Sequence, residues 1–231
     1  MLGLLTFSAC NKERNIKGNG TIISEERTVT EFDRIEVSGS ADVFISNGSD
    51  YSVIVETDSN ILPLIETEVH GAELEIGIKK NTSIRKTSGI KVYVTTPTLN
   101  GVEVSGSGNI SSDDSFTSSS FDIDVSGSGD LDFQDIITDY LIVDISGSGD
   151  VDVASSENTE NHKIDISGSG DVNLLNMPTT HSNIKISGSG SGIVNVSNSL
   201  HVKISGSGDI RYAGTPTITT DITGSGDVNP Y

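Results

Sequence analysis

The segment Val143-Asp-Ile-Ser-Gly-Ser-Gly-Asp-Val-Asp-Val153 alternates strictly between two kinds of residue. Apolar residues or glycines stand at its odd positions, and aspartate or serine stands at its even positions. This two-residue period is typical of β-strands, and no helical period of 3.6 residues accompanies it. The two glycines predict a tight corner, inside which a side chain would find no room. The segment is therefore predicted to be two strands joined by a glycine corner.

The motif Ser-Gly-Ser-Gly-Asp at the centre of this segment recurs, with close variants, through the second half of the chain. The copies begin at Ser105, Ser126, Ser146, Ser167, Ser187, Ser205 and Thr223, so successive starts are 21, 20, 21, 20, 18 and 18 residues apart. A degenerate copy, Ser38-Gly-Ser-Ala-Asp42, stands upstream. A fixed period near 20 residues indicates one structural unit that is stacked many times.

The stretches between the seven full copies contain neither a helix long enough for a βαβ crossover nor a tight turn signal such as Asn-Gly. The sequence therefore predicts an all-β fold, a right-handed, single-stranded parallel β-helix with about 20 residues in each three-sided coil. Apolar residues just before each motif should form one internal ladder. These residues are Val125, Ile145, Ile166, Ile186, Ile204 and Ile222.

The chain divides into three predicted parts. Residues 1–10 are interpreted as a lipoprotein signal remnant, residues 11–20 as a tether, and residues 21–231 as the β-helix domain. Within that domain, residues 21–100 are less regular and residues 101–231 carry the regular repeats. We expect the irregular part to cap the β-helix or to form its first coils, with a hairpin turn at His70-Gly71 and one helical turn within residues 60–66.

The N-terminal part ends in Phe7-Ser-Ala-Cys10, which resembles the lipobox of bacterial lipoproteins. This resemblance implies cleavage before Cys10 and attachment of lipid to it, hence a membrane partner and a place in the bacterial cell envelope, at the outer membrane or cell surface. Cys10 is the only cysteine, so no disulfide or cysteine–metal framework competes with this interpretation. The alternative is an unprocessed N-terminus.

Two charged features of the β-helix domain admit more than one interpretation. The stretch 79–91 contains five of the fourteen basic residues and is either a solvated loop or an anion contact. The fifth motif position places Asp130, Asp150 and Asp171 in a column, where carboxylates ~4.8 Å apart repel by about 1 kcal/mol in water. Each aspartate is expected to accept hydrogen bonds from backbone N–H groups at its glycine corner. The alternative is a column that binds divalent cations. Two residues before each motif lies a second charged column, which begins at Glu103.

The segments Phe32–Ser46 and Asn60–Val69, followed by the repeated Ser-Gly-Ser-Gly-Asp motif, resemble the bacterial family called the putative auto-transporter adhesin, head GIN domain. The resemblance covers residues 20 to 230. It implies a β-helical fold on secreted or lipid-anchored proteins and an adhesin role, and it brings no catalytic residues.

We therefore expect a non-catalytic, lipid-anchored surface or periplasm-facing protein that binds a glycan or a protein and needs no cofactor. The alternatives are a polysaccharide lyase or hydrolase, suggested by the fold alone, and a structural spacer without a ligand. The net charge of −19 excludes a typical nucleic-acid-binding protein. The four histidines are expected at the surface, without forming a metal site. We also expect self-association through the C-terminal coil, because its strands would offer an unpaired edge.

Overall fold

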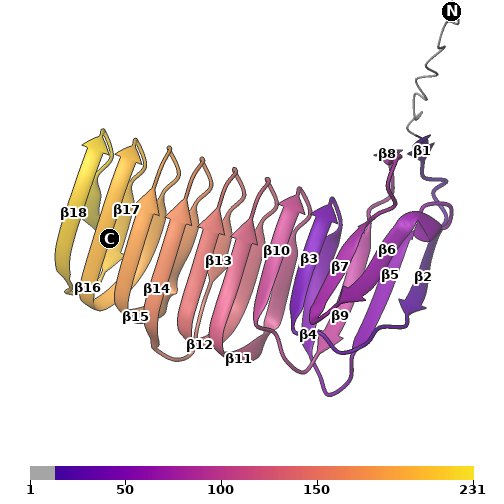
Figure 1. Cartoon of the computed structure of the whole chain (residues 1–231), viewed down its shortest axis with the longest axis horizontal. Helices are drawn as coiled ribbons and strands as arrows, with labels where there is room; N and C mark the ends of the chain where they lie inside the picture. Colours follow the sequence, from indigo (N-terminus) through magenta and orange to yellow (C-terminus); the bar gives the residue numbers. More distant parts are fainter. Residues whose placement is uncertain (1–13) are drawn as a thin grey trace, which may run out of the picture.

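The computed structural model describes residues 14–231, and its strands form a parallel β-solenoid (Figure 1). The elements are β1 (Arg14–Lys17), β2 (Ile22–Arg27), β3 (Arg34–Gly39), β4 (Asp42–Asn47), β5 (Ser52–Asp58), the 3₁₀ helix η1 (Leu62–Leu64), β6 (Ile65–His70), β7 (Glu73–Ile78), β8 (Thr82–Lys86), β9 (Lys91–Thr96), β10 (Gly101–Gly106), β11 (Ile110–Val125), β12 (Leu131–Ile145), β13 (Val151–Val153), β14 (Thr159–Ile166), β15 (Val172–Ile186), β16 (Gly192–Gly206), β17 (Ile210–Ala213), β18 (Thr217–Gly224) and β19 (Val228–Pro230). No described helix is long and apolar enough to cross a membrane.

Strand β12 shows how one coil acquires three sides. Its buried side chains alternate with exposed or half-buried ones along residues 131–133, 136–138 and 141–145. The alternation slips at Gln134–Asp135 and again at Asp139–Tyr140, where two successive side chains point outward. These slips are two corners of the coil, and the Ser-Gly motif is the third. The predicted three-sided coil of about 20 residues is therefore confirmed.

The motif separates two long faces of the solenoid. We call face A the sheet formed by the segments that precede each motif, and face B the sheet formed by the segments that follow it. From β10 to β19 all neighbouring strands pair in parallel. The predicted internal ladder is confirmed, since the six residues from Val125 to Ile222 stand in register on face A. The first five are buried, whereas Ile222 is 39% exposed because no described strand lies beyond β18. Self-association through this coil stays a prediction.

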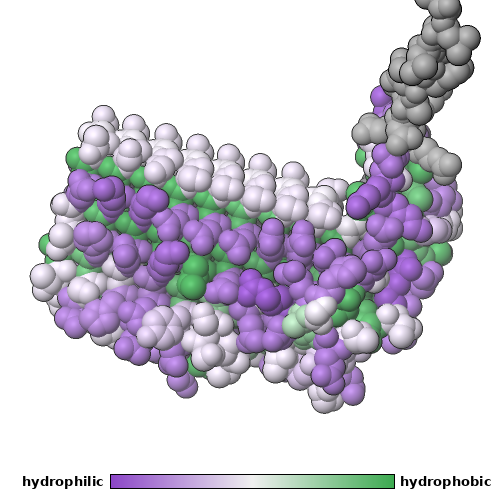
Figure 2. Space-filling model, in the orientation of Figure 1, coloured by the Kyte–Doolittle hydropathy of each residue, from purple (hydrophilic) through white to green (hydrophobic). Residues whose placement is uncertain are grey.

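The motif copies project beyond their flanking strands and form a ridge of serine and glycine along the solenoid (Figures 1 and 2). A Cβ atom on Gly147 would collide with the backbone oxygen of Gly127 in the preceding coil, and one on Gly149 would collide with that of Gly129. The sequence led us to expect crowding inside each corner. The structure places the crowding between neighbouring coils, because the Cα–H bonds of these glycines point along the stacking direction.

The N-terminal third both caps the solenoid and forms its first coils. Strand β3 pairs with β7 and β10, and β4 pairs with β9 and β11, so the degenerate motif between β3 and β4 joins the ridge. The predicted hairpin turn joins β6 to β7, and the predicted helical turn is η1. Beyond these coils the pairing becomes antiparallel, in β2–β5, β5–β9 and β6–β7. The parallel stack therefore begins with the coil that contains β7 and β9, and the antiparallel strands lie at its end.

Part of the predicted tether belongs to the folded protein. Residues 14–17 form β1, which pairs in parallel with β8, and the Gly18 N–H donates to the Lys86 oxygen at 2.7 Å. The Asn19 N–H donates to Oδ1 of Asn60 at 2.9 Å. The sequence of this strand is polar apart from Ile16, which is why the pattern resembles a linker. The predicted lipidation site Cys10 lies outside the described residues.

Replacing Gly147 by alanine is expected to destabilise the protein by about 1–3 kcal/mol, because the added methyl group must push two backbones apart. The exposed neighbour Ser148, replaced by alanine, should leave stability nearly unchanged. Chemical denaturation of both variants measures the difference. Equal stability of Gly147→Ala and wild type would contradict the close approach of the coils.

Candidate functional site

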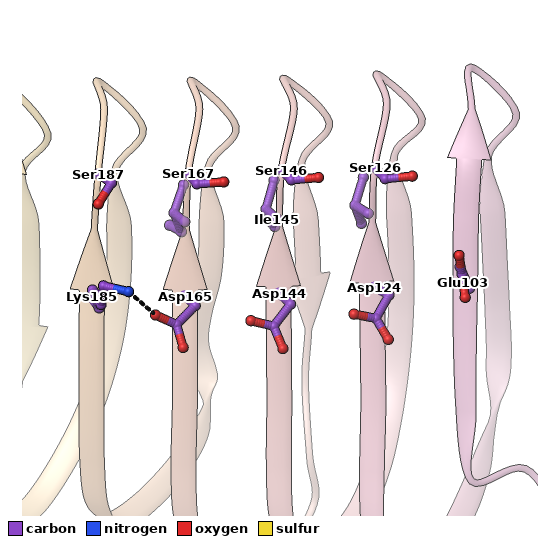
Figure 3. Close-up of a pocket in the computed structure, with 12 residues that line it drawn as sticks. Glu103, Asp124, Ser126, Asp144, Ile145, Ser146, Asp165, Ser167, Lys185 and Ser187 are labelled. Carbon is purple, nitrogen blue, oxygen red and sulfur yellow. Dashed lines mark ion pairs between the residues drawn. The ribbon is translucent and has the colours of Figure 1, made fainter.

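Two grooves run along the solenoid, one on each side of the ridge. Groove A, of about 550 Å³, lies on face A and is shown in Figure 3. Its charged and hydroxyl side chains come from successive coils, and the groove is lined by Glu103, Asp124, Asp144, Asp165, Lys185, Ser126, Ser146, Ser167 and Ser187, with Val125, Ile145 and Ile166 beneath them. Figure 2 shows the pale ridge, a hydrophobic stripe below it and a hydrophilic row below that stripe. Groove B, of about 510 Å³, lies on face B.

The charged column that lines groove A runs beyond the groove at both ends and is longer than the sequence analysis predicted. Beyond Glu103, the register continues to Glu36 on β3 and Glu75 on β7. The column therefore reads, from coil to coil, Glu75, Glu36, Glu103, Asp124, Asp144, Asp165, Lys185, Lys203 and Asp221. Glu36 stands two residues before the degenerate motif copy, as Glu103 does before the first full copy, and this spacing was the signal available in the sequence.

The two halves of this column differ in their electrostatics. In the second half, Lys185 lies 3.6 Å from Asp165, and Lys203 lies 2.9 Å from Asp221. In the first half, partial burial raises the pKa of Glu36, Glu103 and Asp124, and the neighbouring carboxylates raise it further. The negative charge of the column is therefore concentrated over β7, β3, β10 and β11.

Arg34 offsets only part of the repulsion among the carboxylates of this acidic half. Its guanidinium forms a 2.8 Å ion pair with Asp122, two strands away, and lies 3.9 Å from Glu73. A Cβ atom on the intervening Gly101 would lie 2.8 Å from the guanidinium nitrogen. Glycine at this position therefore lets the Arg34 side chain cross β10 to reach Asp122. The Arg34 charge lowers the pKa of Glu103 and Asp124, but less than burial and the neighbouring carboxylates raise them.

Among the described residues, Glu36, Glu73 and Glu75 form a group of three carboxylates that lie within 4.8 Å of one another. Oxygen ligands of this kind suit a hard divalent cation. The predicted cation column of Asp130, Asp150 and Asp171 does not form such a group.

These three aspartates instead connect successive coils. Oδ1 of Asp130 accepts a hydrogen bond from the Asp150 N–H at 3.1 Å, and Oδ1 of Asp150 accepts one from the Asp171 N–H at 2.9 Å. Asp171 accepts in the same way from the Ser191 N–H at 2.7 Å. The expected hydrogen bond from a backbone N–H is present, but its donor belongs to the next coil and not to the aspartate's own corner.

Groove B combines these aspartates with a second polar row. The row contains Ser111, Asp132, Asp152 and Asn173, which stand in register on face B. Asn173 Nδ2 donates to Asp152 at 2.8 Å. The groove therefore presents many hydrogen-bond acceptors and a few donors along one line.

The polar row continues at its N-terminal end into exposed apolar side chains. Phe44 is in register with Ser111, Tyr93 with Phe44, and Ile54 with Tyr93. The rings of Phe44 and Tyr93 stack with centroids 5.4 Å apart and planes 22° apart, and each residue is 39% exposed. We call Ile54, Tyr93 and Phe44 the aromatic platform. The sequence analysis missed it, because only the pairing of β4 with β9 brings these residues together.

One of the four histidines corrects the sequence analysis, which expected all of them at the surface. His162 is buried, with 2% exposure, in the core column that also holds Leu141 and Ser182. Burial lowers its pKa to about 3, so the ring is neutral at physiological pH. His181 Nδ1 lies 2.7 Å from the Ser199 hydroxyl. A Ser-His-Asp triad needs a carboxylate that orients the histidine. Among the described ion pairs, the histidine that lies beside carboxylates is His70, 3.3 Å from Glu68 and 3.8 Å from Glu75.

Replacing Asp124 by asparagine is expected to stabilise the protein at neutral pH. Because folding raises its pKa, the ionised carboxylate costs stability, and this cost grows as the pH rises through the unfolded and then the folded pKa. The melting temperature should rise by about 2–4 °C at pH 7, equivalent to about 1 kcal/mol, and should change little at pH 3. The matched variant Asp165→Asn, which loses a contact with Lys185, should not be stabilised. A lower melting temperature of Asp124→Asn at pH 7 would show that the ionised carboxylate does not cost stability.

Comparisons with known proteins agree on the fold. A putative adhesin from Bacteroides fragilis has a solved structure that superimposes with a TM-score of 0.88, at 24% identity over 94% of this chain and all of that chain. Two structures from Parabacteroides distasonis, described as a putative lipid binding protein and a putative adhesin, have TM-scores of 0.79 and 0.76, each at 25% identity and with the same coverage. A search of curated proteins found no match.

A family model matches residues 31–216, which contain all but the last motif copy together with both grooves. The chain therefore belongs to the family described as "Putative auto-transporter adhesin, head GIN domain".

Proposed function

We propose that this protein is a non-catalytic, lipid-anchored binding protein of the bacterial cell envelope and that its ligand is a linear glycan chain lying along groove B. The family description and the solved relatives described as adhesins support a binding role at the cell surface or envelope. One relative from Parabacteroides distasonis is described as a putative lipid binding protein, so a lipid is the competing ligand class.

The observation that carries the proposal is the continuity of the aromatic platform with the polar row of groove B. Aromatic faces pack against the apolar faces of sugar rings, while carboxylate and amide groups bind hydroxyl groups. A linear polysaccharide presents such faces and hydroxyl groups along its whole length. Groove B offers similar polar side chains at each coil, ~4.8 Å apart, and the platform provides an apolar end point.

The similarity of the coils favours binding over catalysis. A glycoside hydrolase needs two carboxylates with different protonation states. Asp130, Asp150 and Asp171 share one environment, because each accepts the same hydrogen bond from the following coil. Such equivalent groups suit repeated contacts with a polymer and do not separate an acid from a base.

The glycan proposal is tested by screening the protein on a glycan array and measuring the affinity of the best ligand. Tyr93→Ala is expected to weaken binding by about two- to tenfold, because stacking on the platform is lost. Tyr140→Ala is the matched control, since Tyr140 is 50% exposed at a corner outside both grooves. An equal loss of glycan affinity in Tyr93→Ala and Tyr140→Ala would contradict a role of the aromatic platform in binding.

The same screen separates the alternatives. New reducing or unsaturated ends that disappear in Asp150→Asn or Asp171→Asn would make the protein an enzyme. Binding of lipids without glycans would favour the competing ligand class. If the protein binds nothing in the glycan, lipid and protein pull-down assays, the result would favour a structural spacer without a ligand.

Lipid anchoring is proposed from the sequence Phe7-Ser-Ala-Cys10. Labelled fatty acid fed to an expressing bacterium should enter the wild-type protein and should be absent from Cys10→Ser. Equal labelling of the two proteins would refute attachment at this residue.

A further inference from the structure

Strands β1 and β8 form a small arm that projects from the N-terminal end of the solenoid (Figure 1). We call residues 14–17 and 79–86 the basic arm, because they contain no acidic residue in a chain whose net charge is −19. Its exposed cationic side chains are Lys17, Lys79, Lys80, Arg85 and Lys86. Among the described residues, none of these five lies within ion-pair distance of a carboxylate, whereas Lys163, Lys185 and Lys203 on the solenoid do.

The base of the arm is held by one buried carboxylate. Asp58 accepts a hydrogen bond from the Gly20 N–H, which follows β1, at 2.5 Å. It also accepts from the Thr87 hydroxyl and the Ser88 N–H, which follow β8, each at 2.7 Å. The bond from Ser88 contributes most to lowering the Asp58 pKa. Ile16 and Ile84, which are paired in register, pack against the core. The cations are therefore carried on an element fixed to the body.

The position of the arm along the chain points to its partner. Only three residues separate Cys10 from Arg14, where β1 begins, so the two Cα atoms lie at most about 14 Å apart. A lipid on Cys10 would therefore keep the arm at the headgroup level of the bilayer. Clustered lysine and arginine at that level are attracted to anionic lipids, by about 1 kcal/mol for each cation near the surface.

We propose that the basic arm binds the anionic phospholipid surface next to the anchor, as a second membrane attachment. This inference rests on the proposed lipidation of Cys10. The acidic excess lies on the rest of the molecule, so the same surface repels the acidic half of the charged column, Glu75, Glu36, Glu103 and Asp124. Attraction at the arm and repulsion elsewhere would hold the solenoid away from the membrane, with the ridge and both grooves accessible.

The test uses the full chain with Cys10→Ser, so that no lipid contributes, and two sets of vesicles. One set is phosphatidylcholine, and the other is phosphatidylcholine mixed with phosphatidylglycerol. The protein should sediment with the anionic vesicles only, and this binding should fade as salt is added. Apolar insertion of residues 1–9 would instead be insensitive to salt and to lipid charge.

Two charge-neutralised proteins complete the test. The arm variant carries Lys79→Gln, Lys80→Gln, Arg85→Gln and Lys86→Gln. The solenoid variant carries Lys163→Gln, Lys185→Gln and Lys203→Gln. Binding should fall by about fivefold for each arm cation removed and should stay near wild type in the solenoid variant. Both variants should keep the wild-type melting temperature within a few degrees, because the substituted side chains are exposed.

Binding that is equal on neutral vesicles, insensitive to salt or unchanged in the arm variant would overturn the proposal. So would binding to an anionic polysaccharide with no binding to vesicles. Failure of the lipid-anchor proposal is a separate result, because it is read from fatty-acid labelling of the wild type and not from vesicle binding of Cys10→Ser.

Discussion

The rest of the structure depends on the close, in-register stacking of one coil on the next. At the ridge the coils approach so closely that a single Cβ atom would meet the preceding backbone, as at Gly147. This contact excludes slippage, so each residue lies above its counterpart in the neighbouring coil. A chemical group that recurs in the sequence therefore becomes a continuous column in space. The hydrophobic ladder, the hydrogen-bonded aspartates and the charged row of groove A are three such columns.

Columns of like charge are tolerated here in two different ways. Along groove B, the repulsion between neighbouring aspartates is offset in part by hydrogen bonds. Each aspartate accepts one from the backbone N–H of the next, as Asp130 does from Asp150. Along groove A, Lys185 and Lys203 interrupt the series in the second half, while the first half keeps carboxylates with raised pKa values. With the basic arm beyond that acidic half, charge varies along the solenoid axis even though the backbone repeats.

The repeated part of the fold was predictable from the sequence, and the N-terminal third was predictable only locally. The motif spacing gives the coil length, the parallel pairing and the ladder. The placement of β3 and β4 between later strands follows no local pattern, so the aromatic platform escaped prediction. The extension of the charged column to Glu36 could have been predicted, because Glu36 stands two residues before the degenerate motif copy. The burial of His162 could have been predicted from the sequence. His162 stands four residues before Ile166, just as the buried Leu141 stands four residues before Ile145.

The insertion of β3 and β4 between later strands also constrains the order of folding. These strands, residues 34–47, lie between one coil built from residues 73–96 and another built from residues 101–125. Their two neighbours on each face are therefore synthesised after them, and their contacts close loops of tens of residues, which slows folding. The downstream repeats, by contrast, pair with immediate neighbours and can assemble coil by coil. The solenoid consequently cannot grow simply from its N-terminus, and the region that carries the aromatic platform is completed only after the chain beyond residue 100 has emerged.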